Sequence, residues 1–165
     1  MQFEGEYLNG KRNGKCKEYH YNGQLKFEGE YLNGEKNGIA KEYHYGGKLE
    51  FEGEYLNGKI QGKVKEYYNN GPLQFEGEYF KGKKHGNAKE YYNNGRLKFE
   101  GKYLNGKRNK EGKEYNMDDD TLIFEGKYYN GKRWNEREYN NGELEGVYLN
   151  GDFLEGDESD ERDER

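Results

Sequence analysis

Four residues of the 165-residue chain carry a thiol or an imidazole that could serve as a nucleophile, a general base or a metal ligand: Cys16, His20, His44 and His85. The chain has a single serine and a single threonine, so hydroxyl nucleophiles are almost absent. Cys16 and His20 are four residues apart, which on an extended strand corresponds to about 13 Å. At that separation they can neither share a metal ion nor form a thiolate–imidazole pair within one strand.

His20 and His44 are 24 residues apart and occupy equivalent positions in the sequence. The same spacing leads on to Tyr68 and Tyr92. A position that accepts either histidine or tyrosine is typical of a surface or stacking position. The sequence therefore predicts no metal site.

Glu28 and Glu30, and their equivalents along the chain, resemble the paired carboxylates of a general acid–base site. In the strand register derived below, Lys17 and Lys15 face these two carboxylates, which favours a salt-bridged solvent face. The chain also lacks the G-x-x-x-x-G-K-[ST] phosphate loop and the G-x-G-x-x-G dinucleotide fingerprint. We predict no catalytic residues, no cofactor and no enzyme activity.

These residues belong to a tandem repeat, F-E-G-[EK]-Y-x-x-G-[KE]-x-x-G-x-x-K-E-Y-x-x-x-G-x-L-x. Its Phe-Glu-Gly start recurs at steps of 24 residues, with 25 for the last step. The starts are Phe3, Phe27, Phe51, Phe75, Phe99 and Phe124. The frame degrades after residue 107, and the last unit (144–151) is shortened, as expected of an end repeat. We predict an array over residues 1–154, with about six units and a degenerate C-terminal cap.

Each unit is expected to form two short strands, for example 26–32 and 39–45. Alternation of residue types and Asn-Gly or Gly-Gly turns favour β-hairpins. A glycine every few residues, at about 1 kcal/mol each relative to alanine, disfavours helix. The sequence predicts an all-β fold: one elongated, single-layer antiparallel sheet of about twelve to fourteen strands, built from tandem 24-residue hairpins.

The strand register follows if Asn22-Gly23 forms a two-residue turn. Lys17 then pairs with Glu28, and opposite charges face each other in every regular unit. On the other face Cys16 meets Gly29, a small residue against glycine, which leaves room for aromatic rings over the backbone. Glu18 opposes Phe27, and the sequence gives no reason for a carboxylate on that face.

The charge of the chain is concentrated at its C-terminal end. Residues 155–165 (EGDESDERDER) hold seven acids and two arginines, a net charge of −5, which equals that of the whole chain. The neutral remainder argues against nucleic-acid binding, which depends on excess positive charge. We predict that residues 155–165 form a disordered acidic tail.

The single cysteine excludes an internal disulfide, no segment is apolar enough to span a membrane, and the N-terminus lacks the features of a signal peptide. We expect an intracellular, cytoplasmic protein, with association with a membrane surface as an alternative.

The loop after the first strand of each unit is rich in basic residues. These loops would lie along one edge of the ribbon at intervals of roughly 10 Å. Such a basic ridge could bind anionic lipid headgroups, or it could simply keep the sheet rim soluble. Its residues are Lys11, Arg12, Lys36, Lys59, Lys83, Lys84, Lys107, Arg108, Lys132 and Arg133.

One face of the sheet would carry aromatic residues that no second layer can cover. These rings could bind a partner protein or mediate self-association, or they could pack only on one another along the ribbon. The residues are Phe27, Tyr31, Phe51, Tyr55, Phe75, Tyr79, Phe99 and Tyr103.

The repeat frame resembles the MORN repeat, whose core reads Y-E-G-x-[WY]-x-x-G-x-x-x-G-x-G, and the resemblance covers residues 3–151. Two features depart from that pattern: the period is one residue longer, and residues such as Cys16, Ala40 and Val64 replace the last glycine. The K-E-Y-x-x-x-G-x-L ending resembles variant MORN repeats of bacterial antitoxin-like proteins. The resemblance implies a ribbon that binds partner segments, associates with itself or tethers membranes.

We therefore expect a non-enzymatic repeat scaffold that mediates protein–protein interaction through the aromatic face. Two alternatives remain open. One is a membrane-surface tether that binds anionic phospholipid through the basic ridge. The other is an antitoxin-like inhibitor of a partner toxin.

Overall fold

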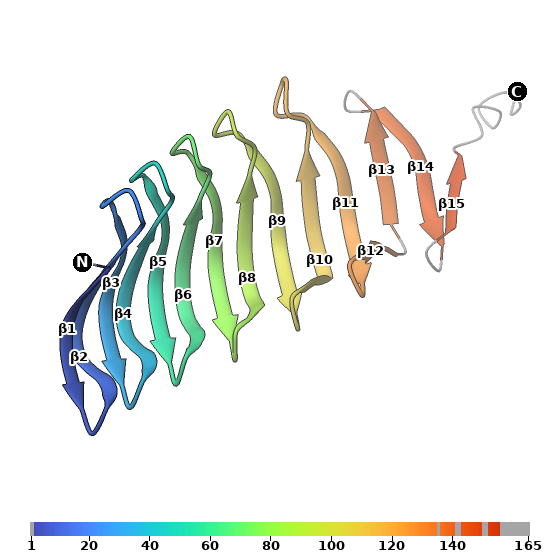
Figure 1. The fold of residues 1–165 in the computed structure, drawn as a ribbon. Coiled ribbons are helices and arrows are strands. Elements are labelled where there is room, and N and C mark those ends of the chain that lie inside the picture. Colours follow the sequence, from blue (N-terminus) through green and yellow to red (C-terminus); the bar gives the residue numbers. More distant parts are fainter. Residues whose placement is uncertain (1, 135, 141–142, 150–151, 156–165) are drawn as a thin grey trace, which may run out of the picture.

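The computed structural model describes residues 2–134, 136–140, 143–149 and 152–155, and it contains a single antiparallel sheet (Figure 1). Fourteen strands follow one another across the sheet in chain order, and the short β12 pairs with β11 beside this path. The strands are β1 (Phe3–Leu8), β2 (Lys11–Tyr19), β3 (Leu25–Leu32), β4 (Glu35–Tyr43), β5 (Leu49–Leu56), β6 (Lys59–Tyr67), β7 (Leu73–Phe80), β8 (Lys83–Tyr91), β9 (Leu97–Leu104), β10 (Lys107–Tyr115), β11 (Leu122–Tyr129), β12 (Lys132–Arg133), β13 (Glu136–Asn140), β14 (Glu143–Leu149) and β15 (Asp152–Glu155). The predicted fold, an elongated single-layer sheet of tandem hairpins, is confirmed.

Two kinds of turn join the strands. The tight two-residue turns lie within each unit, as at Asn33-Gly34, where both residues have positive φ (53° and 88°). Asparagine and glycine tolerate this left-handed conformation, which hairpin turns of this type require. Our assignment of a two-residue turn to Asn22-Gly23 was wrong. That connection is a longer loop, closed by a 2.8 Å hydrogen bond from the amide of His20 to the carbonyl of Gln24.

The predicted register is nevertheless confirmed in the middle of the strands. Lys15 pairs with Glu30, Cys16 with Gly29, and Lys17 with Glu28. The additional loop residue is compensated beyond these pairs, between Glu18–Phe27 and Tyr19–Leu25, where β3 contains one extra residue, Lys26. The error in the turn therefore leaves the central pairing unchanged.

A second irregularity lies within each unit and was not predicted. Between β3 and β4, Glu28 pairs with Lys41 but Glu30 pairs with Asn37, so β4 contains extra residues at this point. Gly38, with a φ of 71°, provides the left-handed conformation that such a bulge needs. As a consequence Lys36 lies directly opposite Tyr31 on the aromatic face.

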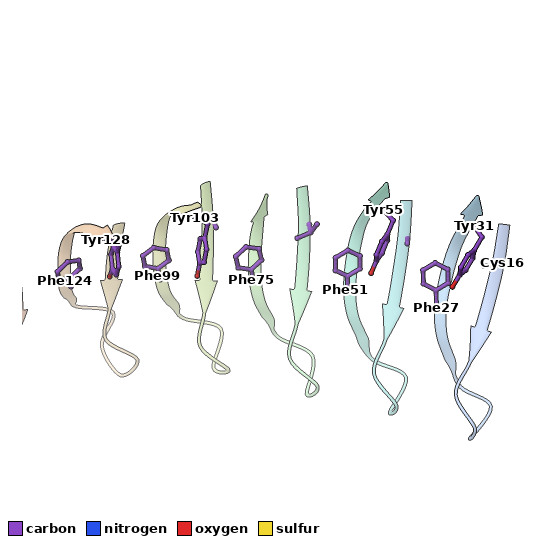
Figure 2. Close-up of a cluster of buried hydrophobic side chains, with 13 residues drawn as sticks. Cys16, Phe27, Tyr31, Phe51, Tyr55, Phe75, Phe99, Tyr103, Phe124 and Tyr128 are labelled. Atoms are coloured by element: carbon purple, nitrogen blue, oxygen red, sulfur yellow. The ribbon is translucent and has the colours of Figure 1, made fainter. Parts of the chain in front are cut away.

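The core consists of the aromatic residues along one face of the sheet together with the small side chains of Cys16, Ala40, Val64 and Ala88 (Figure 2). The Phe27 ring contacts Gly29 so closely that a Cβ atom on that glycine would lie 2.8 Å from the ring's Cζ. Phe27 and Tyr31 pack edge to face, with ring centroids 5.7 Å apart. Each glycine of this column thus leaves the space in which a phenylalanine ring packs.

Candidate functional site

The aromatic residues proposed to bind a partner are buried within the sheet's own core. Seven of the eight are at most 9% exposed, and Tyr79 is half-buried. The rings pack along the ribbon, one hairpin against the next, as in the contact between Phe75 and Tyr103 (centroids 6.0 Å apart). A partner could reach these rings only by displacing the side chains that cover them.

The cover is formed by half of the residues assigned to the basic ridge. Lys36 Nζ lies 4.4 Å from the centroid of the Phe27 ring, and Lys84 Nζ lies 3.6 Å from that of Phe75. Arg12, Arg108 and Arg133 lie over phenylalanine rings in the same way. From the sequence, these five cations were expected on a ridge open to anions. In the structure they lie over the aromatic core instead.

The carboxylates that had no explanation in the sequence complete this arrangement. Glu18 and Glu42 each accept a 2.6 Å hydrogen bond from a tyrosine hydroxyl of the next unit, Tyr31 and Tyr55 respectively. A cation joins each carboxylate, as where Lys36 Nζ lies 2.6 Å from Glu42. The same tyrosine bond is repeated at three further carboxylates: Glu66, Glu90 and Glu114.

These contacts lower the pKa of Glu114 and raise the pKa of Tyr31. Burial opposes ionisation of Glu114, but hydrogen bonds from Arg133 and Tyr128 outweigh burial and lower its pKa. Burial and the bond to Glu18 raise the pKa of Tyr31 to about 12. The contacts therefore stabilise Glu114 as a carboxylate and Tyr31 as a neutral phenol.

The histidines and Cys16 also have structural positions. His20 Nε2 lies 2.9 Å from the carbonyl oxygen of Tyr43 in the next unit, and the Tyr68 hydroxyl donates to the carbonyl of Tyr91 (2.8 Å). Burial raises the pKa of the Cys16 thiol to about 11, which disfavours the reactive thiolate. Among the described residues, no cluster of three or more histidine, cysteine or acidic side chains could hold a metal ion.

The opposite face carries rows of charged residues, and we call it the Lys/Glu face. In the row that contains Lys17 and Glu28, positive and negative residues alternate from strand to strand. The Lys17–Glu28 ion pair measures 3.4 Å, and the equivalent Lys113–Glu125 pair measures 2.9 Å. The opposite-charge pairing predicted from the sequence is confirmed, and the row carries little net charge.

A groove of about 1250 Å³ runs across the Lys/Glu face from β4 to β11. Its floor is the backbone of the small-residue column, such as Gly53 and Ala88, and its two walls are the charged residues on either side. A smaller groove of about 570 Å³ continues toward β1, and Ile39, which is 80% exposed, lines both. The groove was not predicted from the sequence, although the sequence contains its signal, a column of small residues between charged neighbours.

The tight-turn edge of the Lys/Glu face forms a second open surface, which we call the rim. Each hairpin places there one exposed apolar residue, between 43% and 58% exposed. These residues are Leu8, Leu32, Leu56, Phe80, Leu104 and Tyr129. Their strand partners are the exposed Lys11, Glu35, Lys59, Lys83, Lys107 and Lys132.

The predicted acidic tail lies almost entirely outside the described part of the chain. Of the predicted acidic tail, residues 156–165 lie outside the described residues, and Glu155 is the last residue of β15. In the part of the chain that is described, no helix is long and apolar enough to cross a membrane.

The repeats match a known family model, the MORN repeat variant, at four consecutive segments: 12–33, 36–57, 60–81 and 84–105. Together these segments make up more than half of the chain. Three of the four begin at a cation that covers a phenylalanine ring: Arg12, Lys36 and Lys84. No curated protein matches the chain.

Proposed function

We propose a function on the premise that the chain belongs to the MORN repeat variant family, whose repeats are non-catalytic. The chain is a scaffold that binds a polypeptide in the groove of the Lys/Glu face. The family makes the chain a repeat scaffold for protein or membrane interaction. The observation that supports the finer proposal is the contrast between the two faces. The aromatic face is closed by its own cations, whereas the Lys/Glu face is hollowed across eight strands.

The size of the groove favours a chain segment over a small molecule. Small-molecule sites typically enclose about 300–1,000 Å³ and bury most of their ligand. The groove exceeds that range at about 1250 Å³. Its eight strands, spaced by about 4.8 Å, extend it over roughly 34 Å.

The charge of the groove favours a polypeptide over nucleic acid. Lysines on its walls, such as Lys41 and Lys65, lie opposite Glu52 and Glu76 on the neighbouring strands. Nucleic-acid binding depends on an excess of positive charge that can neutralise phosphates. Walls of alternating sign provide no such excess.

Selection of random twelve-residue peptides displayed on phage tests this proposal. The wild-type chain is compared with a double variant, Ile39→Trp and Asn87→Trp, which places two large rings in the groove. Leu56→Trp, at an exposed rim position, is the matched control. We expect enriched peptides that bind the wild type and the control but not the double variant. Enrichment that is unaffected by the double variant, or no enrichment at all, would contradict the proposal.

An anionic lipid surface is a second candidate, because of the composition of the rim. Five exposed lysines there are each paired in register with an exposed apolar side chain, for example Lys59 with Leu56 and Lys83 with Phe80. Apolar side chains can enter the interfacial region of a bilayer while lysines contact anionic headgroups, at about 1 kcal/mol for each lysine near the surface. The groove and the rim do not share the residues named here, so variants can separate the two functions.

A further inference from the structure

We propose that the segment bound in the groove is extended, with polyproline II geometry and about eleven residues long. The inference rests on the proposed function, because it names the class of polypeptide that the same groove accepts. Three properties of the groove support it: its cross-section, its repeat spacing and the chemistry of its floor.

The mean cross-section of the groove is closer to that of an extended chain than to that of a helix. A volume of about 1250 Å³ spread over roughly 34 Å gives a mean cross-section of roughly 37 Å². An extended chain packed in a sheet occupies about 4.8 Å by 10 Å, or roughly 48 Å². An α-helix with side chains is about 10–12 Å across, which corresponds to roughly 80–110 Å². An extended segment would therefore leave a smaller part of its cross-section above the walls than a helix would.

The spacing of the hairpins selects among extended conformations. One unit of two strands advances about 9.6 Å across the sheet. Three residues of polyproline II, one turn, advance about 9.3 Å, whereas two residues of a β-strand advance only about 6.7 Å. A polyproline II segment thus presents an equivalent side chain to each successive hairpin. A β-strand loses this match within one unit.

The floor of the groove provides no hydrogen bonds for a β-strand. Its backbone, for example at Gly53 and Ala88, already pairs within the sheet, as in the pairs Ala40–Gly53 and Ala88–Gly101. Addition of a strand needs a row of unpaired backbone groups, which exists only at sheet edges. Polyproline II has no such requirement, because its backbone is solvated and makes no internal bonds.

The walls indicate the side chains that such a segment would carry. Each central hairpin presents both signs of charge, and Ile39 adds an exposed apolar side chain at one end of the groove. Proline rings can contact Ile39 and the apolar parts of the floor. Alternating charges at every third residue can then meet the walls.

The test uses the intact chain and two labelled twelve-residue peptides. The first contains four triplets of two prolines and one charged residue, with lysine and glutamate in alternation. The second is an alanine-based peptide of the same charge, held in a helix by side-chain lactam bridges. Fluorescence anisotropy measures binding to the wild type, to the double variant Ile39→Trp and Asn87→Trp, and to Leu56→Trp. Circular dichroism confirms that each variant is folded.

We expect the proline peptide to bind the wild type and Leu56→Trp equally, and to bind the double variant at least tenfold more weakly. We expect no groove-dependent binding of the helical peptide. Absence of groove-dependent binding by the proline peptide, or preference for the helix, would overturn the inference. The phage selection tests the proposed function separately. Enriched peptides that bind in the groove but lack polyproline II character would support the proposed function and refute this inference.

Discussion

The hydroxyl of Tyr55 donates a 2.6 Å hydrogen bond to Oε1 of Glu42, thirteen residues earlier in the chain. Lys36 Nζ lies 2.6 Å from the same oxygen and also 4.4 Å from the Phe27 ring centroid. One carboxylate therefore joins a cation of its own unit to a tyrosine of the next. In a repeat array, where stability depends on contacts between neighbouring units, this bond directly couples two hairpins.

Replacement of Tyr55 by phenylalanine should destabilise the chain by roughly 1.5–3 kcal/mol, as expected for a hydrogen bond to a charged group. The ring and its packing against Phe51 are retained, so the loss reports the hydroxyl alone. Urea denaturation followed by circular dichroism measures the change. Tyr21→Phe, at a side chain 91% exposed, is the control and should leave stability unchanged. Equal effects of the two variants would refute a role for the Tyr55–Glu42 bond.

Gly101 and Gly46 offer a second matched pair. A Cβ atom on Gly101 would lie 2.6 Å from the Phe99 ring, 2.7 Å from the Cα of Gly112 and 2.9 Å from the carbonyl oxygen of Glu111. Two of these atoms belong to the backbone and cannot rotate away. Gly101→Ala should therefore cost about 1–3 kcal/mol, as overpacking of a core does.

Gly46→Ala is the control for this effect. No atom lies within 4 Å of a Cβ built on Gly46, and its φ is not in the left-handed region. The substitution should be neutral or slightly stabilising, because alanine reduces the freedom of the unfolded chain. Thermal unfolding of both variants measures the difference. A stable Gly101→Ala chain would show that the glycine column is not required for ring packing.

The acid limit of stability should be set in part by Glu90 and Glu114. Burial opposes their ionisation, but arginine and tyrosine donors outweigh burial and lower both pKa values. A glutamate in the unfolded chain titrates near pH 4.3. Since the folded pKa values are depressed, their contribution is present above about pH 4.3 and is lost as the pH falls through the folded values.

Urea unfolding at a series of pH values measures this dependence. Glu114→Gln should lower stability at neutral pH and make the decline in acid shallower, because one of the two titrating groups is gone. A decline in acid with the same slope as wild type would assign the acid sensitivity to other carboxylates.

The alkaline limit should be set by tyrosines. Burial, followed by hydrogen bonds to carboxylates, raises the pKa of Tyr31, Tyr67, Tyr91 and Tyr115 to about 12. Tyrosine in an unfolded chain titrates near pH 10. The raised values mean that these groups contribute stability below about pH 10, and that the contribution is lost between about pH 10 and pH 12.

Ultraviolet absorbance of tyrosinate, recorded alongside circular dichroism, measures this transition. We expect tyrosinate from these four tyrosines to appear together with loss of the strand signal. Ionisation of all tyrosines near pH 10 in a chain that stays folded would contradict the hydrogen-bonded arrangement.

The strand pairs that depend only on local alternation of residue types were predicted correctly from the sequence. Lys17 and Glu28 pair as expected, because both lie in the middle of regular strands where the period of two is uninterrupted. The position of Arg12 could not be predicted in this way. The bulge at Gly14 realigns the strand, so Arg12 pairs with Tyr7 on the aromatic face rather than remaining on a ridge of cations.

The role of Glu18 and its equivalents could not be predicted from the sequence, for a related reason. Its hydrogen-bond donor, Tyr31, belongs to the next unit, and its cation, Arg12, reaches it only after the bulge. Pairwise alternation within one hairpin contains neither contact. The groove was not predicted, because its walls are charged residues that the sequence had already assigned to strand pairing.

Lys83 and Lys84 are adjacent in sequence but should respond in opposite ways to loss of charge. Lys84 Nζ lies 3.2 Å from Glu66 and 3.6 Å from the Phe75 ring centroid, whereas Lys83 is exposed on the rim opposite Phe80. Lys84→Gln should reduce stability by about 0.5–2 kcal/mol through loss of the cation–π contact and the ion pair. Lys83→Gln should leave the free energy of unfolding unchanged.

Binding to the lipid surface should show the reverse dependence. Co-sedimentation with vesicles of phosphatidylcholine and phosphatidylserine measures the membrane partition coefficient of each variant. Combined replacement of Lys59, Lys83 and Lys107 by glutamine should weaken binding at least tenfold, since each lysine contributes about 1 kcal/mol near an anionic surface. Lys84→Gln should bind like the wild type. If the wild-type chain does not bind these vesicles, or if the triple variant binds as well as wild type, the rim is not a lipid-binding surface.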